Sequence, residues 1–419
     1  MSTAFKTADI LIPKNVEMEK WAVVACDQYT GQPDYWKRVE ENVGDAPSTL
    51  KLILPEVYLE EPDSAERISK IHNEMNAILG TDTLTEYKDS LIYIERVQSD
   101  GKVRQGLIGA IDLEEYDYRK GSSSQVRATE ATVIERIPPR IKVRQGAPME
   151  LPHIMILIDD EEKTVVEPCE EIKKSGKPVY DFTLMEKGGK ICGYVVDDTL
   201  KSSVFDALDK LNDNDVFNKK YNLSGYPTLL YAMGDGNHSL ATAKEFYEQL
   251  KRENPDKDLS NHPARYALVE IVNLHSPALE FEAIHRIVTN VNTDELMEEM
   301  TTALGLSEEK AEQAFKVILK GAEKTYYVHK PTSQLTVGSL QEFLDAYLKK
   351  SGAKIDYIHG IDVVKSLAEQ ENSIGFILPN MKKSELFPTV IKDGALPRKT
   401  FSMGHAEDKR FYIECRKIK

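Results

Sequence analysis

Apolar and polar positions along the chain follow two periods, one typical of strands and one typical of helices. The apolar run at residues 21–25 predicts a short buried strand. Residues 63–80 predict a helix, because Asp63 and Glu66 form a capping box and the apolar residues that follow share one face. The apolar-rich runs on either side of Asp100-Gly101 predict a β-hairpin, since Asp-Gly favours tight turns.

The middle of the chain continues this alternation. Residues 121–146 are polar and basic and contain a Pro-Pro pair, and they predict a long functional loop with a short helix. Residues 227–233 predict a strand, which a glycine-rich loop connects to a helix that opens at Ser239. A further strand is expected at residues 265–273.

Helices are predicted to dominate from about residue 291 onward. The expected elements are helices at 293–304, 308–319 and 340–350, with strands near 326–329 and 374–378. The alternation of strands and helices along the chain indicates an α+β (mixed α/β) fold. A length of 419 residues predicts two or three domains. We place an N-terminal α/β region at 1–116, a core that carries the glycine loop at 117–288, and a mainly helical C-terminal α/β region at 289–419.

Composition and charge argue against several classes of protein. The chain has 54 Lys+Arg and 69 Asp+Glu, a net charge of −15, whereas non-specific binding to nucleic acid depends on cations that meet phosphates. The most apolar stretch, residues 153–158, is far shorter than the ~20 residues of a membrane-spanning helix. The N-terminus lacks a signal-peptide pattern, and the four cysteines lack C-x-x-C spacing, which predicts reduced thiols and no zinc framework. We expect a cytoplasmic protein that binds neither nucleic acid nor membrane.

The segment from Gly234 to Ser239, with the sequence GDGNHS, carries the strongest chemical signal. A strand, a glycine loop and a helix form an anion site in many folds, because glycine lets the backbone approach a phosphate and the first helical N–H groups are unpaired. Asp235 fits such a site if it binds Mg²⁺ or accepts a hydrogen bond from a substrate, and His238 fits as a donor to a phosphate oxygen. The alternative is a tight turn with Ser239 as the helix N-cap.

A second group of charged residues lies in the polar segment. Carboxylates among arginines suit the handling of substrates or phosphates. The alternative is a solvated loop held by surface salt bridges. The group consists of Arg127, Thr129, Glu130, Thr132, Glu135, Arg136 and Arg140.

A third candidate is Arg286, which stands with His285 between apolar neighbours. A cation between inward-facing apolar residues is costly unless it is paired. Arg286 therefore either pairs within the structure or projects into a phosphate pocket, and both alternatives stay open. The remaining histidines considered as ligands, at positions 262, 275, 359 and 405, show no metal-ligand spacing such as i, i+4, and we assign no metal to them.

Six segments, in order along the chain, resemble the motifs of one family. They are VACDQYTGQPDYW (24–36), GLIGAIDLEEY (106–116), RATEAT (127–132), MGDGNHSLATA (233–243), AIHRIV (283–288) and LPRKTFSMG (396–404). Together they are similar to the segments of the unknown-function domain family 1015. The core of that family resembles the fold of ParB, sulfiredoxin and the ADP-dependent free serine kinase.

The resemblance implies a ParB- and serine-kinase-like core over residues 117–288 and a phosphotransferase reaction. A phosphoryl group would pass from ADP or ATP to a small hydroxyl metabolite, and Glu130 matches the glutamate that accepts the hydroxyl proton. The catalytic set would be Glu130, Asp235 and His238, with Mg²⁺ at Asp235. The nucleotide would be held by Gly234, Gly236, Asn237 and Ser239, with Arg127 or Arg286 as cations.

The loop departs from the family pattern in residues that matter for phosphate binding. Asn237, His238 and Ser239 stand where the family has His-His-Arg, and a serine does not reproduce the bidentate contact of an arginine with a phosphate. Two hypotheses follow. The first is a nucleotide- and Mg²⁺-dependent phosphotransferase. The alternative is a non-catalytic, nucleotide-binding regulatory protein of the ParB-like fold.

Overall fold

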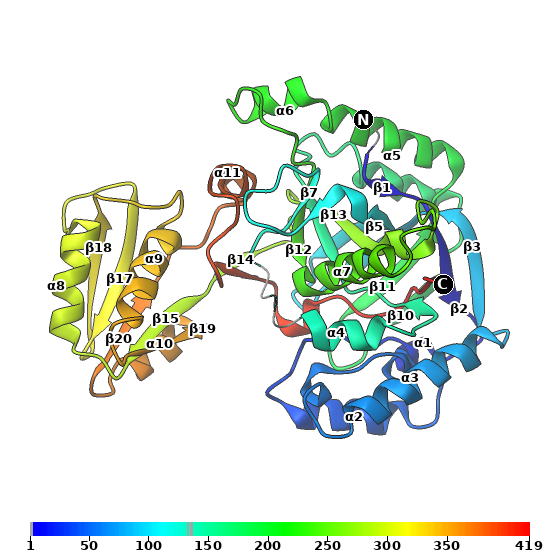
Figure 1. Cartoon of the computed structure of the whole chain (residues 1–419), viewed down its shortest axis with the longest axis horizontal. Coiled ribbons are helices and arrows are strands. Elements are labelled where there is room, and N and C mark those ends of the chain that lie inside the picture. Colours follow the sequence, from blue (N-terminus) through cyan, green and yellow to red (C-terminus); the bar gives the residue numbers. More distant parts are fainter. Residues whose placement is uncertain (1–2, 132–133, 135–136) are drawn as a thin grey trace. The chain divides into compact units, whose positions relative to one another are not determined.

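Apolar strands from the first two thirds of the chain pair into one large mixed sheet (Figure 1). The computed structural model describes residues 3–131, 134 and 137–419, and it confirms the α+β class. The chain divides into two compact units. The first comprises Met1–Leu279 and His405–Lys419, and the second comprises Glu280–Gly404. In the described part of the chain, no helix combines the length and the apolar composition needed to cross a bilayer.

The large sheet of the first unit has the strand order β10-β11-β4-β5-β13-β9-β12-β7-β6, and β1 also pairs with β5. Its strands are β1 (Phe5–Lys6), β4 (Ile92–Val97), β5 (Val103–Asp112), β6 (Tyr116–Asp117), β7 (Val126–Arg127), β9 (Met155–Ile158), β10 (Tyr180–Thr183), β11 (Lys190–Val195), β12 (Tyr231–Asp235) and β13 (Tyr266–Asn273). The pairs β9–β13, β12–β7 and β6–β7 are parallel, and the other pairs are antiparallel.

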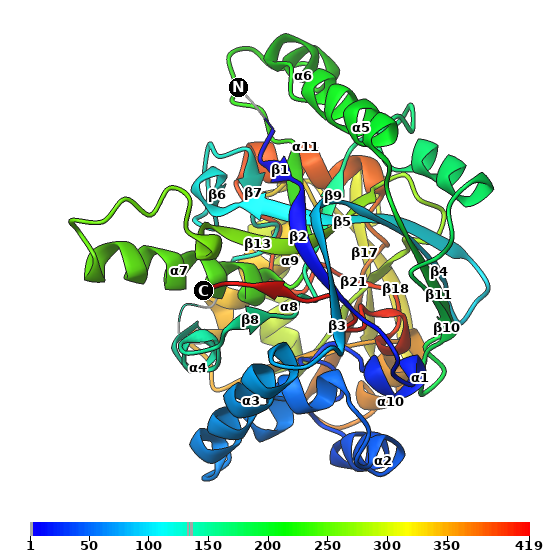
Figure 2. The ribbon, with the colours of Figure 1, turned by 90° about the vertical axis from the view of Figure 1, so that its right-hand side faces the viewer.

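Helices and short strands cover this sheet. The α-helices of the first unit are α1 (Met18–Trp21), α2 (Pro33–Val43), α3 (Ser64–Leu79), α4 (Ile137–Arg144), α5 (Asp198–Leu211), α6 (Asn214–Lys220) and α7 (Asn237–Glu253). Its 3-10 helices are η1 (Thr49–Leu52), η2 (Glu56–Tyr58), η3 (Leu113–Glu115), η5 (Glu167–Lys174), η6 (Pro263–Arg265) and η7 (Ala406–Asp408). Two small antiparallel pairs complete the unit: β2 (Ala8–Pro13) with β3 (Leu84–Ser90), side by side in Figure 2, and β8 (Met149–Glu150) with β22 (Arg416–Lys417).

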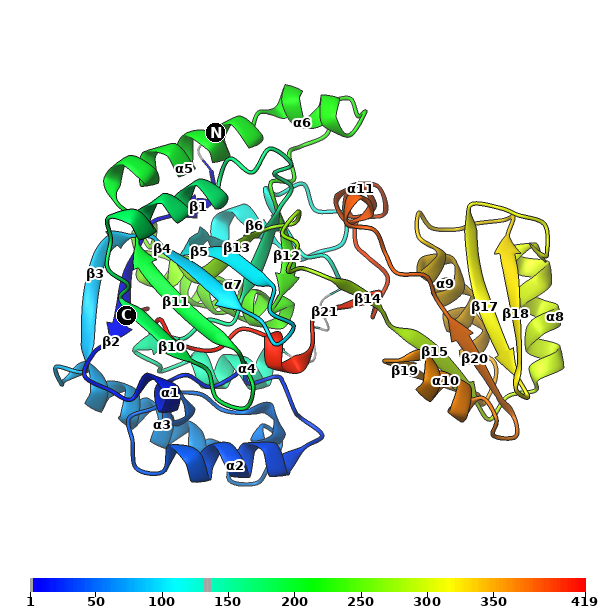
Figure 3. The same cartoon turned by 180° about the vertical axis from the view of Figure 1, so that it is seen from behind.

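The central strand β13 buries side chains on both of its faces, because successive strand residues point to opposite sides. Leu268 belongs to a hydrophobic core with Trp36 of α2. Its neighbour Val269 belongs to a second core with Leu240 and Phe246 of α7. The helix α7 lies in front of the sheet in Figure 1, and strands β4, β10 and β11 come to the front in Figure 3. The sheet is therefore the middle layer of the first unit.

The C-terminal segment His405–Lys419 returns to the first unit and is anchored there by buried groups. Phe411 makes an isolated β-bridge to Val24. The fully buried guanidinium group of Arg96 donates hydrogen bonds to the carbonyl oxygens of Glu407 (2.5 Å) and Lys409 (2.6 Å). These contacts fix the position of the backbone at Lys409.

The second unit is built on a six-stranded antiparallel sheet. The strand order is β16-β18-β17-β20-β15-β19, with β15 (His285–Thr289), β16 (Leu306–Ser307), β17 (Gln313–Leu319), β18 (Ala322–Val328), β19 (Lys354–Ile358) and β20 (Ser373–Ile377). Strands β14 (Phe281–Ala283) and β21 (Phe401–Met403) form a separate pair. The helices of the second unit are α8 (Thr293–Leu304), α9 (Thr336–Leu348), α10 (Ile361–Leu367) and α11 (Lys383–Asp393).

Two elements expected from the sequence differ from the structure. The helix predicted at 308–319 is wrong, because this stretch contains β17, in which the buried residues Gln313, Phe315 and Val317 alternate with less buried ones. The C-terminal region is therefore not mainly helical. The strand predicted at 21–25 does not join a sheet either, although all five of its residues are buried in the core.

The division into units also differs from the three regions expected. The boundary expected after residue 116 falls inside the first unit, because β5 before it pairs with β13 after it in the same sheet. The boundary expected after residue 288 falls inside the second unit, which begins at Glu280. Local patterns did not show that the segment 405–419 closes the first unit, since that contact joins the two ends of the chain.

Candidate functional site

The glycine loop forms the junction between strand β12 and helix α7. Gly236 adopts a left-handed backbone conformation, with φ = 76°, and it is the N-cap residue of α7. A Cβ atom on Gly236 would lie only 3.1 Å from the Cα atom of Ile154. Glycine is therefore required here for two reasons: the backbone angle and the close approach of the strand beside it. The register of β12 also shifts at Gly234, between Met233 and Asp235.

The N-terminus of α7 is not capped by a side chain. The first N–H groups of a helix lack partners within it, and the helix dipole adds positive potential at this end. Asn237, the first residue of the helix, holds its buried Oδ1 atom without a hydrogen-bond partner in the described structure. Ser239 lies inside the first turn and is not the N-cap residue. This helix end therefore has the properties of an anion site.

Asp235 at the end of β12 is paired with a lysine from the C-terminal segment. The Nζ atom of Lys409 lies 3.2 Å from Oδ2 of Asp235, and both side chains are largely buried, with exposed fractions of 14% and 21%. The other carboxylate oxygen accepts the N–H of Gly236 at 2.9 Å. Lys409 thus brings a positive charge to the start of α7.

A histidine with two partners lies on the other side of Gly236. A Cβ atom on Gly236 would lie 3.5 Å from Cδ2 of His153, a residue that precedes β9. The hydroxyl oxygen of Tyr412 is 2.8 Å from Nδ1 of His153, and Oδ2 of Asp27 is 3.8 Å from its Nε2. His153 thus lies between a tyrosine hydroxyl group and a carboxylate.

The surroundings set the protonation states of this cluster. Burial raises the pKa of Asp27, but the charges of His153 and Lys409 and a hydrogen bond from Gln28 lower it further than burial raises it, so the net shift is downward. Burial raises the pKa of the Tyr412 hydroxyl well above its ordinary value. At neutral pH, the cluster holds an ionised Asp27 and a neutral tyrosine.

Glu130 lies at the same sheet edge as Asp235. In the parallel pair of β7 and β12, Val126 is opposite Tyr231 and Arg127 is opposite Ala232. The hydroxyl group of Thr129 then donates to the carbonyl oxygen of Met233 at 2.8 Å. β7 ends three residues before Glu130, and β12 ends at Asp235. The Thr129 hydrogen bond therefore holds the segment directly before Glu130 at the carboxyl end of β12.

The two arginines expected to bind phosphate hold backbone instead. Arg127 is buried, and its guanidinium group donates to the carbonyl oxygens of Ser124 (2.7 Å) and Pro227 (2.9 Å); burial lowers its pKa to about 10. Arg286 is fully buried in the second unit, where it donates to Oε1 of Gln341 and to the carbonyl oxygens of residues 398 and 399. Both groups fix local loops.

The other charged and polar residues near α7 make local contacts. Lys244 pairs with Glu248 on the same helix at 2.7 Å. His238 lies in the first turn of α7, and its carbonyl oxygen accepts the hydroxyl group of Thr242. Thr132, Glu135 and Arg136 fall outside the described residues.

Sequence reasoning missed three residues of the site: Lys409, His153 and Tyr412. They lie far from the glycine loop in the sequence, and Lys409 and Tyr412 stand in the last eleven residues. The only local signal was a histidine directly before an apolar strand, and that position is also typical of an ordinary strand end.

The chain belongs to the family described as "Protein of unknown function (DUF1015)", which matches residues 10–347. This confirms the family resemblance; five of the six segments lie within the match, and the segment 396–404 lies outside it. No curated protein matches the chain.

Three solved structures show a weak similarity. A conserved hypothetical protein from Pyrococcus furiosus is 13% identical, with 74% of this chain and 95% of that chain covered and a TM-score of 0.37. Free serine kinase in complex with AMP is 12% identical, with 74% and 92% covered and a TM-score of 0.38. SbnI with C-terminal truncation from Staphylococcus aureus is 9% identical, with 73% and 82% covered and a TM-score of 0.35. Similarities at this level carry no argument about the activity of this chain.

Proposed function

We propose that this protein is a nucleotide- and Mg²⁺-dependent phosphotransferase that acts on a small hydroxyl metabolite. The observation that carries the proposal is the uncapped N-terminus of α7, which follows the left-handed Gly236 and has Lys409 at its side. A helix N-terminus with a neighbouring cation binds phosphate groups through N–H donors and charge. Lys409 takes the place that the sequence had assigned to Arg127 or Arg286.

Glu130 supplies the base for the transfer. The reaction breaks the bond between the terminal phosphorus and the leaving nucleotide and forms a bond from that phosphorus to the acceptor oxygen. The proton of the acceptor hydroxyl passes to the carboxylate of Glu130, which follows Thr129 in the chain, and Thr129 is hydrogen-bonded to Met233 of β12. A base and a phosphate site on the same sheet edge are the minimum that this chemistry requires.

The oxygen donors at the loop fit Mg²⁺. Asp235 contributes a carboxylate, and Asn237 contributes a buried amide oxygen that has no hydrogen-bond partner in the described structure. Mg²⁺ is usually held by one or two carboxylates together with substrate phosphates, so a cage of protein ligands is not needed. When bound, Mg²⁺ neutralises charge on the phosphate oxygens.

A second candidate function is nucleotide binding without transfer, in a regulatory protein. Two observations favour it. The loop residues Asn237 and Ser239 are uncharged, and the positive charge of Lys409 is already paired with Asp235. The two functions share the nucleotide site and differ in the role of Glu130.

The substitution Glu130→Gln separates the two functions. We expect MgADP or MgATP to bind the variant with nearly unchanged affinity, because the phosphate site remains, while phosphoryl transfer falls by at least a factor of about 100 with the loss of the base. Transfer is followed by ³¹P NMR with a panel of amino acids and sugars as acceptors. Wild-type protein that binds nucleotide but phosphorylates none of them would support the regulatory function. Transfer at the wild-type rate by the variant would contradict the assignment of the base.

A further inference from the structure

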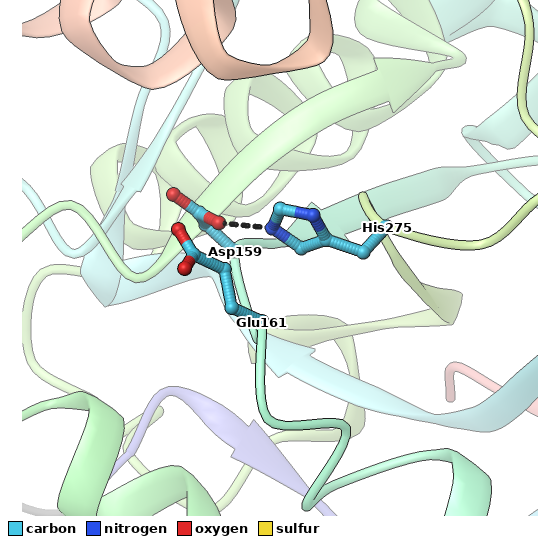
Figure 4. Close-up of side chains that lie close together, drawn as sticks. All are labelled: Asp159, Glu161 and His275. Carbon is cyan, nitrogen blue, oxygen red and sulfur yellow. Dashed lines mark hydrogen bonds and ion pairs between the residues drawn. The ribbon is translucent and has the colours of Figure 1, made fainter.

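Three metal-ligating side chains meet at a second place in the first unit. Asp159, Glu161 and His275 each offer a ligand atom, and these atoms lie within 4.8 Å of one another (Figure 4). Asp159 follows β9 and His275 follows β13, and these parallel strands end level with each other, with Ile158 opposite Asn273. In Figure 4 the imidazole ring faces the two carboxylate groups.

Buried polar groups hold the two backbone segments that carry these ligands. The carboxylate of Asp160, which is 1% exposed, accepts the N–H groups of Thr164 (2.6 Å) and Val165 (2.9 Å). The side-chain amide of Asn273 donates to the carbonyl oxygen of Asp160 at 2.8 Å, and its Oδ1 atom accepts the N–H of His275 at 3.1 Å. Hydrogen bonds that hold the backbone on either side of metal ligands orient these ligands before a metal ion binds.

The cluster already attracts a cation. The Nζ atom of Lys220, at the end of α6, lies 3.0 Å from Oδ1 of Asp159 and 3.7 Å from Oε1 of Glu161. The same Oδ1 atom is 2.6 Å from Nε2 of His275. The hydroxyl group of Tyr221 donates to Oδ2, the other carboxylate oxygen of Asp159. Two carboxylates thus bind one positive charge, with an imidazole nitrogen beside them.

We propose that Asp159, Glu161 and His275 bind a divalent transition-metal ion of the Zn²⁺ class, in competition with the ammonium group of Lys220. Two carboxylates and one imidazole form a set of three protein ligands, which leaves a fourth position for water. An imidazole ligand favours Zn²⁺ over Mg²⁺ and Ca²⁺, which prefer oxygen ligands alone. Ligand atoms that share one Zn²⁺ lie about 3–4 Å apart, so only small side-chain movements are needed.

The metal site is separate from the proposed nucleotide site. His153 precedes β9 and Asp159 follows it, and six residues of extended chain span about 20 Å. The inference therefore does not rest on the proposed function. Sequence spacing concealed the site, because His275 and the two carboxylates come from segments that meet only through the pairing of β9 with β13.

The test is a titration of the full-length, chelator-treated protein with Zn²⁺ against a chromophoric competing chelator. We expect wild-type protein to bind one equivalent with this site. Glu161→Gln and His275→Gln should weaken its affinity at least about tenfold through the loss of a ligand. Lys220→Met should strengthen it on the order of tenfold, because a competing charge is removed. Lys219→Met, at an exposed position on the same helix, is the matched control and should change nothing.

The Lys220 variant makes the test decisive, since a purely structural ion pair predicts no gain in Zn²⁺ affinity. Far-ultraviolet circular dichroism confirms that each variant is folded. Absence of a one-equivalent site in wild-type protein would overturn the proposal. So would a site whose affinity is unchanged in Glu161→Gln, His275→Gln and Lys220→Met alike.

Discussion

At the scale of single residues, Gly236 has the most stringent requirement in the site. Its left-handed backbone turns the chain from β12 into α7, and its hydrogen atom faces Ile154 where any other residue would place a side chain. Gly225 offers a matched comparison, because it has a similar φ of +70° but a Cβ atom added there would meet no atom within 4 Å. Substitution of these two glycines by alanine separates the free-energy cost of the backbone angle from the free-energy cost of the close contact.

We expect Gly225→Ala to lower the free energy of unfolding by about 1 kcal/mol, the cost of a left-handed L-residue. Gly236→Ala should cost about 1 kcal/mol more, because the strand beside it must also move. Both tryptophans, Trp21 and Trp36, lie in the first unit, so tryptophan emission during urea unfolding reports on that unit alone. Equal losses in the two variants would contradict the close-contact argument.

At the scale of elements, buried charges tie the C-terminal segment to the central strand of the large sheet. Glu270 of β13 accepts hydrogen bonds from Arg104 of β5 (3.1 Å) and from Arg410 (2.8 Å), and none of the three is more than 4% exposed. Burial raises the pKa of Glu270, but the two arginines lower it by more, and its net shift is below the ordinary value of 4.5.

Glu270→Gln should therefore lower the free energy of unfolding by about 3–5 kcal/mol at pH 7, because two buried guanidinium groups lose their shared anion. Because the pKa of Glu270 is lowered, its interaction with the two arginines stabilises the folded state fully above about pH 4.5. This stabilisation is lost as the pH falls through the lower pKa of the folded state. The difference between wild type and variant should thus shrink as the pH falls below about 4.5, the ordinary pKa of the carboxyl group.

Urea unfolding followed by tryptophan emission at several pH values measures this difference. Glu86→Gln is the control, since Glu86 forms an exposed ion pair with Lys417 at 2.9 Å and should cost less than about 1 kcal/mol. A loss for Glu270→Gln that stays constant with pH would show that the carboxylate is not the source of the stability.

The same scale shows how far the sequence predicts the structure. The helix at 63–80 and the strand at 265–273 follow from local periodicity and appear as α3 and β13. The junction of β12 with α7 was visible because Gly234 and Gly236 stand only two positions apart in the chain. The stretch 308–319 was misassigned because a short apolar run fits both periods, and its pairing with β18 and β20 decides the outcome.

The candidate site could be predicted only in part for a related physical reason. Asp235 ends β12 and Glu130 comes three residues after β7, and the parallel pairing of these two strands is a property of the sheet. Lys409 and His153 reach the loop through long-range contacts, among them the hydrogen bond from Arg96 to the Lys409 carbonyl oxygen. Such contacts leave no periodic pattern in the sequence. Arg127, expected to bind phosphate, donates to carbonyl oxygens, and Arg286 follows the alternative in which it pairs within the structure.

At the scale of the whole molecule, the second unit is an insertion in the first. The chain leaves the first unit after Leu279 and returns at His405. The entering strand β14 and the leaving strand β21 pair directly, with Phe281 opposite Met403, so the two ends of the insertion are one strand spacing apart. Asp235, Gly236, Asn237 and Lys409 of the proposed nucleotide site belong to the first unit, whereas Arg286 belongs to the second.

Replacement of Glu280–Gly404 by a short Gly/Ser linker should leave the first unit folded. We expect its urea midpoint to stay close to that of the full chain, and its affinity for MgADP to change by less than about threefold. Tryptophan emission and calorimetric titration measure the two quantities. A folded first unit that no longer binds nucleotide would contradict the assignment of the nucleotide site to the first unit alone.

The proposed function depends on the binding of nucleotide phosphates at the start of α7 beside Lys409. The most direct measurement is calorimetric titration of MgADP and MgATP into wild-type protein, Lys409→Met and the control Lys417→Met, an exposed lysine in the same C-terminal segment. We expect binding to wild type and to the control, with a loss of roughly 10- to 100-fold in Lys409→Met, the value of a charge-assisted hydrogen bond. Nucleotide that fails to bind wild-type protein, or that binds Lys409→Met as tightly, would contradict the account.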